Sequence, residues 1–400
     1  MTKSILTING GSSSLKFALF DNTAELTATV RGEIEDLDAA PHLLARDAAG
    51  AVLAEHRWSA GTGHPFAIAL NTLLSFTDSH LGRDGLTAVG HRVVHGGADH
   101  IAPEMITPAL VALLETLTPL DPLHMPDNLA PMRAVTAARP RLAQVACFDT
   151  AFHHAMPPVA ARFALPRALE AKGVRRYGFH GLSYEYISSC LKKQSPALAR
   201  GRVIAAHLGS GASLCALSDG SSIATTTGFS ALDGLVMATR CGSLDPGVIL
   251  YLGRLGYSFA DVEDLLYRRS GLLGLSGISG DVRVLLASDD PHARDAIELF
   301  TYRIALEAGA MISALGGLDG LVFTAGIGEH APAIRAAVCA RLSWLGLRID
   351  DAANAADAAR ISMPDSDVEV CVIPTDEELM IARHTQATIN RAVGRRELVS

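Results

Sequence analysis

The sequence predicts an α/β protein built from two related domains. Its 400 residues exceed what a single hydrophobic core usually contains, so two domains are expected. Apolar residues make up 49% of the chain and 36 residues are glycine, a composition typical of a compact α/β protein. The third observation is a pattern of strand, glycine-serine turn and strand that occurs near the N-terminus and again near the middle of the chain.

The first copy of this pattern is ILTINGGSSSLKFALFD, residues 5–21. Apolar runs on both sides of a polar turn predict two strands. Gly10 and Gly11 allow the backbone to approach a ligand closely. The exposed N–H groups and the hydroxyls of Ser12, Ser13 and Ser14 form a concavity suited to an anion. Lys16 adds a positive charge for a phosphate. The alternative is an ordinary serine-rich hairpin.

The second copy, VIAAHLGSGASLCALSD, covers residues 203–219 and places Gly209 198 residues after Gly11. Two related halves, each opening with such a hairpin, can hold the phosphates of one nucleotide from two sides. This layout resembles the duplicated two-domain fold of the actin-like ATPases and sugar kinases, a ribonuclease H-like fold. We expect an N-terminal domain over 1–150 on the acceptor side, rejoined by a final helix over 384–400, and a C-terminal domain over 151–383 on the nucleotide side.

Charge and cysteine usage limit the classes of function. The net charge of −8 without a basic block argues against a nucleic-acid partner. The six cysteines are scattered and form no CxxC pair, which indicates reduced thiols and a cytoplasmic protein. The N-terminal residues enter a strand without a signal-peptide pattern, and no apolar run is long enough to cross a membrane.

In the first half, apolar periodicity predicts strands and helices that alternate along the chain. We expect strands over 25–35, 86–95 and 143–150, and helices over 65–80 and 129–138.

Two charged residues stand out in these elements. Arg92 lies among valines in a buried strand, so it requires an anion, which is either a ligand or a structural carboxylate. Asp149 ends the strand over 143–150, at the edge where parallel sheets carry their chemistry.

The second half places polar residues at glycine-rich turns. Phe179 and His180 stand between glycines before a helix expected from Tyr184, which suits either contact with a transferring group or a hydrogen bond within the loop. Arg240 lies in a long loop over 230–246, and the longest helix is expected over 291–315. Residues 321–330 read as strand, glycine turn and helix start, a setting that can hold a nucleotide.

The final strand is expected over 368–375, followed by a helix that opens with a capping box over 375–378. Glu377 lies in the first turn of this helix, where the helix dipole keeps its carboxylate ionised. Such a carboxylate suits a magnesium ion beside phosphates, and the alternative is a surface glutamate.

From residue 3 to about 386 the chain resembles the acetate/propionate kinase (acetokinase) family. The resemblance is carried by motifs in the family's order: INGGSSSLK (8–16), GHRVVHGG (90–97), FDTAFH (148–153), YGFHG (177–181), HLGSGAS (207–213), TRCG with DPG (239–247), SGISGD (276–281), FTAGIGE (323–329) and PTDEEL (374–379).

The resemblance implies an enzyme that reversibly transfers a phosphoryl group from ATP to acetate, giving acetyl phosphate and ADP. It implies Mg²⁺ (or Mn²⁺) held by Asn9 and Glu377. It also implies catalytic roles for Arg92, Asp149, His180 and Arg240, and an acid pocket of Arg92, Val94, Leu123, Phe179 and Ala231. A nucleotide site is implied at Ser12, Lys16, His207, Leu208, Gly209, Ser210, Gly211, Asp281, Val282, Arg283, Gly326, Ile327, Gly328, Glu329 and His330. A homodimer formed through the second domain is implied as well.

The chemistry agrees with these roles. A carboxylate acceptor is already ionised near pH 7, so it needs no general base, and the difficulty is repulsion between two anions. Arginines, a histidine and a cation reduce that repulsion. Asp149 then acts either as an acid/base or as a positioning group.

The sequence departs from the family pattern at several positions. Serine replaces asparagine at Ser210 and aspartate at Ser243, while histidine replaces asparagine at His330. After the FHG motif, Leu182 and Tyr184 replace threonine and histidine, and alanine replaces proline at Ala231. The smaller Ala231 favours use of propionate as well, since one methylene discriminates by only about 1–3 kcal/mol. A propionate kinase, a sugar kinase and a non-kinase actin-like ATPase are the alternatives.

Overall fold

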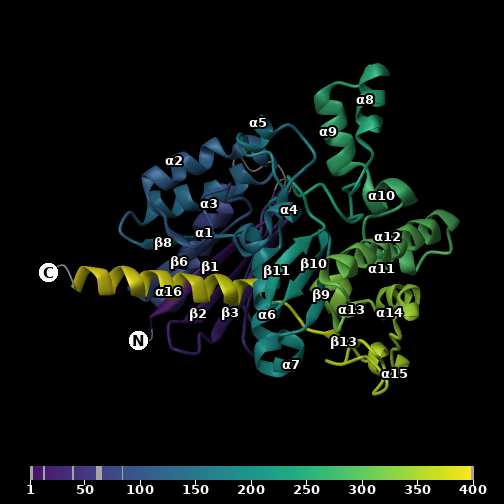
Figure 1. Ribbon diagram of the computed structural model, residues 1–400. Coiled ribbons are helices and arrows are strands. Elements are labelled where there is room, and N and C mark those ends of the chain that lie inside the picture. The colour runs from purple at the N-terminus through teal and green to yellow at the C-terminus, as the bar shows by residue number, and fades with distance from the viewer. Residues whose placement is uncertain (1–2, 12–13, 38–39, 60–64, 83, 398–400) are drawn as a thin grey trace. The chain divides into compact units, whose positions relative to one another are not determined.

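A computed structural model provides the structure of residues 3–11, 14–37, 40–59, 65–82 and 84–397 (Figure 1). The chain forms two compact units, Met1–Ala151 with Asp376–Ser400 and Phe152–Thr375. The chain therefore returns to the first unit at 376, eight residues before the expected 384. The reason is that the whole final helix, α16 (Glu377–Glu397), belongs with the first unit, where it packs on strands of the sheet.

The first unit contains an eight-stranded sheet in the order β5-β4-β3-β2-β1-β6-β8-β7. Its central strands β1, β6 and β8 are parallel, and β1 to β5 form an antiparallel series. The strands are β1 (Ser4–Gly10), β2 (Leu15–Asp21), β3 (Ala28–Glu35), β4 (His42–Asp47), β5 (Val52–Arg57), β6 (Leu86–Val93), β7 (Glu104–Met105) and β8 (Ala143–Phe148). The sequence analysis did not predict β4 and β5. Each of these strands has only six residues, of which half are polar, and β5 at the edge of the sheet is largely exposed.

Helices cover both faces of this sheet. One face packs against α1 (Pro65–Leu81) and α3 (Met125–Ala138) through a core that includes Leu73, Val89 and Val135. The other face packs against α16, which runs along the strands in Figure 1. Gly90 in β6 permits this close approach, because a Cβ there would lie 2.2 Å from Thr385 Oγ1. The remaining helical segments of the unit are α2 (Pro108–Thr116), η1 (Thr118–Leu120) and the start of η2 (Ala151–Ala155).

The second unit contains a five-stranded sheet in the order β11-β10-β9-β12-β13. The strands are β9 (Arg202–Leu208), β10 (Ala212–Ser218), β11 (Ser221–Thr225), β12 (Gly320–Thr324) and β13 (Glu369–Val372). Strand order and directions repeat those of β3-β2-β1-β6-β8, with two antiparallel pairs followed by two parallel pairs. This repetition confirms the duplicated fold that the two hairpins predict.

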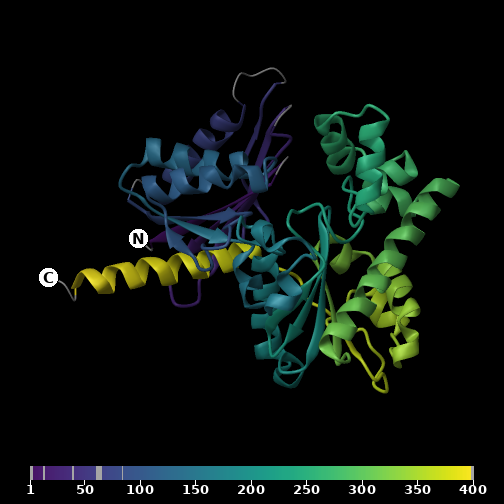
Figure 2. The ribbon, with the colours of Figure 1, turned by 45° about the horizontal axis from the view of Figure 1, so that its top comes forward.

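Helices also cover both faces of the second sheet. Residues of α6 (Gly181–Gln194) and α7 (Pro196–Ala199) pack on one face, and residues of α12 (Pro291–Leu315) and α14 (Pro332–Arg341) pack on the other. The shorter segments are α4 (Pro158–Ala161), α5 (Arg167–Glu170), α10 (Gly271–Ser276), α11 (Val282–Leu286), α13 (Ala325–His330), η3 (Ser343–Leu345) and α15 (Asp351–Ala355). The remaining pair, α8 (Pro246–Arg254) and α9 (Phe259–Arg268), projects away from the sheet of this unit in both views (Figures 1 and 2).

Capping explains where two helices begin. The helix α12 has the predicted bounds, because Asp290 caps its N-terminus, proline follows and Gly316 ends it in a left-handed conformation. At α16 the predicted capping box is wrong. Asp376 Oδ1 accepts the N–H of Leu379 at 2.9 Å, whereas Thr375 donates its own N–H to Glu329.

Candidate active site

The two units are described separately, beginning with the arginine-aspartate pair of the first unit. Arg92 lies in β6, which pairs directly with β8 in the sheet. Asp149 is the residue that follows β8. Arg92 donates to Asp149 Oδ2 from Nε at 2.8 Å and from Nη2 at 2.5 Å, and Nη1 donates to the carbonyl of Gly10 at 3.3 Å. The Asp149 side chain is completely buried and that of Arg92 is 15% exposed. The carboxylate that Arg92 requires is thus another predicted site residue.

Charges around Arg92 keep it protonated. Burial alone would lower the pKa of this guanidinium, but the negative charges of Asp149, Glu377 and Asp121 outweigh it and raise the pKa. Among the described residues, three of its five N–H groups have acceptors. A guanidinium held in this way can bind a carboxylate with its remaining N–H groups.

The predicted magnesium ligands also lie together. Asn9 at the end of β1 donates its amide N–H₂ to Glu377 Oε2 at 2.9 Å and to Glu378 Oε1 at 3.1 Å. Burial raises the pKa of the Glu378 carboxyl, and the charge of Glu377 adds to that rise. Glu378 also lies 3.9 Å from Arg31 Nη1, so both carboxylates have polar partners in this unit.

This donor set fits a magnesium ion bound in its usual manner. Mg²⁺ is held in kinases by one or two carboxylates, water and the phosphates of the substrate. In the described ranges there is no group of three or more His, Cys, Asp and Glu side chains that would form an all-protein metal site. The pair of carboxylates beside Asn9 therefore matches a substrate-assisted site rather than a metal cage.

The turn between β1 and β2 is tied to neighbouring loops. Asn128 in α3 donates to the carbonyl of Gly10 at 3.2 Å and accepts the backbone N–H of Val94 at 2.7 Å. Val94 is buried, and Leu123 is half-buried in the loop before α3. The structure thus brings the loop after β6, which carries Val94, to the first glycine-serine turn. The predicted phosphate ligand Ser12 lies outside the described residues.

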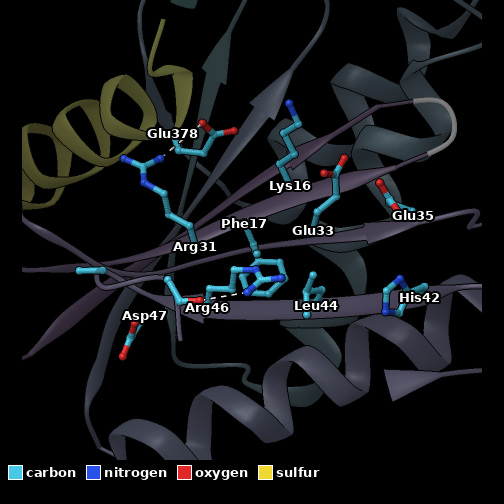
Figure 3. A pocket seen from close by; sticks show the side chains of 13 residues that line it. Lys16, Phe17, Arg31, Glu33, Glu35, His42, Leu44, Arg46, Asp47 and Glu378 are labelled. Atoms are coloured by element: carbon cyan, nitrogen blue, oxygen red, sulfur yellow. Dashed lines mark hydrogen bonds and ion pairs between the residues drawn. The ribbon is translucent and has the colours of Figure 1, made fainter. Parts of the chain in front are cut away.

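Lys16 lies on the same sheet face as Asn9, because the two residues are paired across β1 and β2. It is exposed and lines a cavity of about 500 Å³ (Figure 3). Arg31, Glu33 and Glu378 line the same cavity, and Arg31 pairs with Asp376 at 2.5 Å. Because charges of both signs line this cavity, its walls do not favour one class of ligand.

In the second unit, the glycine-serine turn between β9 and β10 brings His180 and Arg240 together. A Cβ on Gly211 would lie 2.9 Å from Arg240 Nη2 and 3.1 Å from His180 Nε2. Only glycine leaves space for both side chains above this turn. The turn itself is closed by the N–H of Gly209, which donates to the carbonyl of Gly211 at 3.0 Å. Two nitrogen-bearing side chains therefore approach the same glycine, and a role for them in binding an anion stays a prediction.

His180 and His207 form a stacked pair. Their rings are 4.1 Å apart and inclined by 14°. His180 has a left-handed backbone with φ 59° and immediately precedes α6, which therefore begins three residues before the expected Tyr184. Its Nδ1 lies 2.8 Å from Ser213 Oγ, and His207 Nδ1 lies 2.8 Å from Ser183 Oγ. The hydrogen bond of His180 is thus made to Ser213 in β10 rather than within its own loop, and contact with a transferring group stays a prediction.

The loop carrying Arg240 is fixed by backbone bonds. Arg240 Nη1 donates to the carbonyl of Ala231 at 2.7 Å, and Ala238 N–H donates to the carbonyl of Ser210 at 3.0 Å. Ala231 and Phe179 are both buried in this unit. Of the five predicted acid-pocket residues, Arg92, Val94 and Leu123 belong to the first unit, and Phe179 and Ala231 belong to the second.

The remaining predicted nucleotide residues lie at two helix starts. Asp281 caps α11 by accepting the N–H of Arg283 at 2.8 Å, and hydrogen bonds from the Arg283 side chain lower the pKa of Asp281. Between Asp281 and Arg283, Val282 is buried in the core. Gly326, Ile327, Gly328 and Glu329 lie in α13 with His330, and the first residue of this helix, Ala325, has φ 62°. His330 is 73% exposed, and Leu208 is buried beneath the β9–β10 turn.

Residues outside the predicted set support these elements. Arg335 in α14 is fully buried and donates to the carbonyls of Gly328 and Glu329 at 3.0 and 2.7 Å, and also to Asp357 at 2.5 Å. An isolated arginine in the apolar helix PAIRAAVC was the sequence signal for it. Ser183 and Ser213, which contact the stacked histidines, gave no such signal, because serine is common in every setting.

Comparison with known proteins then identifies the family. The model of the acetokinase family matches residues 4–383. The chain belongs to the acetokinase family. A relative from Rhodopseudomonas palustris (strain TIE-1), named acetate kinase, is 53% identical over 391 residues, which are 96% of this chain and 98% of the relative.

Solved acetokinase structures are also similar. An acetate kinase from Porphyromonas gingivalis is 35% identical with a TM-score of 0.85, and the match covers 97% of this chain and 100% of that one. A propionate kinase from Francisella tularensis is 36% identical with a TM-score of 0.89, covering 96% and 99%. These neighbours confirm the two-domain actin-like fold. Within the described parts of this acetokinase, no helix is long and apolar enough to cross a membrane.

Proposed function

We propose that this acetokinase transfers a phosphoryl group reversibly from ATP to acetate, giving acetyl phosphate and ADP by in-line attack of the carboxylate. The family and its named relatives support the activity. The observation that carries the residue assignment is the buried Arg92–Asp149 pair. The Arg92 guanidinium stays positively charged and has unused N–H groups, so it is suited to binding a small anion. If water were the attacking group, the reaction would not need this cation.

The acid is assigned to the first unit. Arg92 binds its carboxylate, and Val94 and Leu123 contribute apolar surface for the methyl group. Asp149 accepts two N–H bonds from Arg92 on one oxygen and so fixes the guanidinium plane. We assign Asp149 a positioning role, because an ionised acceptor has no proton to lose.

The nucleotide is assigned to the second unit. The turns at 207–211, 281–283 and 326–330 would bind ATP. For Lys16 and Ser12, a role in phosphate binding rests on the resemblance to the family. His180 and Arg240, which both approach Gly211, would stabilise negative charge on the transferring phosphoryl oxygens. Removing one preorganised donor of this kind costs about 3 kcal/mol of transition-state stabilisation.

Glu377 and Asn9 are assigned to magnesium. The metal would supply charge neutralisation at the phosphates. Asn9 orients the two carboxylates by donating to both of them. The same site would accept manganese, which prefers the same oxygen ligands.

We propose a homodimer that forms through the second unit. The helix α8 contains no buried residue, although Val248, Ile249, Leu250 and Tyr251 are apolar or aromatic, and Phe259 at the start of α9 is 93% exposed. An apolar patch of this kind is typical of a protein interface, and a second copy of the chain is the proposed occupant. The molar mass in solution tests this, because Phe259→Glu with Leu250→Glu should convert dimers to monomers.

All six cysteines are free thiols, which supports the proposed cytoplasmic location.

Trapping of the acyl phosphate with hydroxylamine tests the activity. ATP, Mg²⁺ and acetate should give acetyl hydroxamate at a rate that depends on the acid. Absence of hydroxamate with every short carboxylic acid, together with acid-independent ATP hydrolysis, would favour the actin-like ATPase instead. Comparing kcat/KM for acetate, propionate and butyrate decides the preferred acid, and a higher value for propionate would support the propionate kinase alternative.

A further inference from the structure

Asn128 is a buried amide near the start of α3 that joins two backbone segments of the first unit. Only 2% of this residue is exposed. Asparagine is a poor helix former, and burial of its amide costs free energy unless the polar groups are hydrogen-bonded. Both ends of the amide are used here. Oδ1 accepts the backbone N–H of Val94 at 2.7 Å, and Nδ2 donates to the carbonyl of Gly10 at 3.2 Å.

The two partners fix the orientation of this amide. A backbone N–H can only donate and a carbonyl can only accept, so the amide oxygen must face Val94 and the amide nitrogen must face Gly10. Turning the amide around would place two donors together and two acceptors together. A side chain that lacks either group therefore breaks at least one of the two bonds.

The two bonds differ in what remains when Asn128 is removed. The carbonyl of Gly10 also accepts a bond from Arg92 Nη1 at 3.3 Å, and Gly10 is paired with Leu15 across β1 and β2. Within the described residues, the N–H of Val94 has no acceptor besides Asn128. Loss of the amide would therefore leave the first glycine-serine turn anchored and would release Val94.

The loop after β6, which carries Val94, is held from two directions. Asp149 donates its N–H to the carbonyl of Val93 at 2.9 Å, and Gly96 donates its N–H to Thr150 Oγ1 at 3.0 Å. These two bonds hold the ends of the loop to the segment that follows β8. The amide in α3 holds the middle of the loop, at Val94.

The same helix follows the second apolar side chain of the proposed acid pocket. Leu123 lies two residues before α3, and the carbonyl of His124 accepts the N–H of Asn128 at 3.0 Å in the first turn. Val94 is buried and Leu123 is half-buried. Asn128 thus connects the helix that follows Leu123 to the loop that carries Val94.

We propose that Asn128 is a positioning residue that sets the separation of Val94 and Leu123 and so determines which chain length of acid the enzyme prefers. This inference rests on the proposed function, in which these two side chains contact the alkyl group of the acid. A pocket whose walls are tied by a buried hydrogen bond fits a short alkyl group closely. A wall released from that bond moves aside for a longer alkyl group.

Steady-state kinetics of Asn128→Ala with acetate and propionate test this role. We expect KM for acetate to rise by roughly threefold to tenfold, the scale of one neutral hydrogen bond, while KM for ATP stays unchanged. KM for propionate should rise less, so the ratio of kcat/KM for acetate to kcat/KM for propionate should fall. General destabilisation would reduce both values equally, so a ratio equal to that of the wild-type enzyme would overturn the proposal.

Hydrogen exchange of the Val94 amide, measured by NMR on the full-length protein, tests the contact independently of activity. Exchange should be slow in the wild-type protein and faster in Asn128→Ala. Asn128→Asp retains an oxygen that accepts from Val94 but cannot donate to Gly10, so exchange should stay slow in that variant. Fast exchange in the wild-type protein, or slow exchange in Asn128→Ala, would also contradict the proposal.

Two further variants complete the test. Thr136→Val is the matched control, because Thr136 lies about two turns further along α3, where its hydroxyl donates to the carbonyl of Met132 at 2.8 Å. This variant should keep the wild-type ratio of acetate to propionate use. If Asn128→Ala does not fold, Asn128→Ser should show the same change in acid preference, because its shorter side chain cannot reach both backbone groups.

The outcomes separate this inference from the proposed function. A wild-type protein that forms no acyl phosphate from any short acid would refute the proposed function. An active wild-type enzyme whose acid preference is unchanged in Asn128→Ala would refute the role of Asn128 alone.

Discussion

Replacing Arg92 by alanine should separate binding of the acid from the rest of the reaction. The substitution removes the guanidinium that the structure holds with Asp149 at 2.8 and 2.5 Å. A hydrogen bond to a charged group contributes about 1.5–3 kcal/mol, so losing one such contact to the acid should raise its KM by roughly 10- to 150-fold. The KM for ATP should change little, because no nucleotide contact is assigned to Arg92.

The same change has a cost for folding. Asp149 is 0% exposed, and removing one partner of a buried ion pair destabilises proteins by about 3–5 kcal/mol. The exposed 15% of the Arg92 side chain lets water reach the vacated position, so we expect the lower end of that range. The double variant Arg92→Met with Asp149→Asn removes both charges and should recover part of the stability but none of the acid binding.

The assay is hydroxamate formation at varied acid and fixed ATP, with urea unfolding of the same samples. Arg92→Lys is the matched control, because it retains the charge but loses the paired N–H geometry, and its KM should fall between wild type and alanine. An unchanged acid KM in folded Arg92→Ala would refute the assignment. A KM increase shared equally by ATP and acid would indicate general distortion instead.

Four other substitutions test the second unit. Arg240→Ala should lower kcat by about 100-fold with little change in either KM, which steady-state kinetics measure. Gly211→Ala should do the same, because its methyl would lie within 3.1 Å of both Arg240 and His180, and equal activity to wild type would contradict the geometry. Arg335→Met should destabilise the fold by about 3–5 kcal/mol, because it leaves buried carbonyls and Asp357 without their donor, and urea unfolding would detect it. Burial lowers the pKa of His153 to about 4, so the unfolded chain binds more protons than the folded chain between pH 4 and 6.5. The free energy of unfolding should therefore fall as pH decreases through that window. His153→Gln should reduce this dependence of the unfolding free energy on pH, which urea unfolding at several pH values measures.

Local patterns in the sequence were enough to predict the duplicated hairpins, the long helix over 291–315 and the strand-to-helix turn near 326. Each depends on neighbouring residues, since alternation, capping and glycine placement act over a few positions. The ordered family motifs likewise predicted site roles for Arg92, Asp149, His180 and Arg240, and these roles stay predictions. These patterns missed β4 and β5, which have only six residues each, half of them polar, and therefore give a weak apolar pattern.

Only the tertiary structure decided how these residues are partnered. Arg92 and Asp149 are 57 positions apart and meet because β6 and β8 are neighbours in the sheet. Asn9 meets Glu377 across 368 positions because the final helix packs on the first strand. The stacking of His180 on His207 depends on the same kind of packing between segments that are distant in sequence. Sequence determines the local elements and their chemical groups, whereas hydrogen-bond partners, burial and protonation are set by which distant elements pack together.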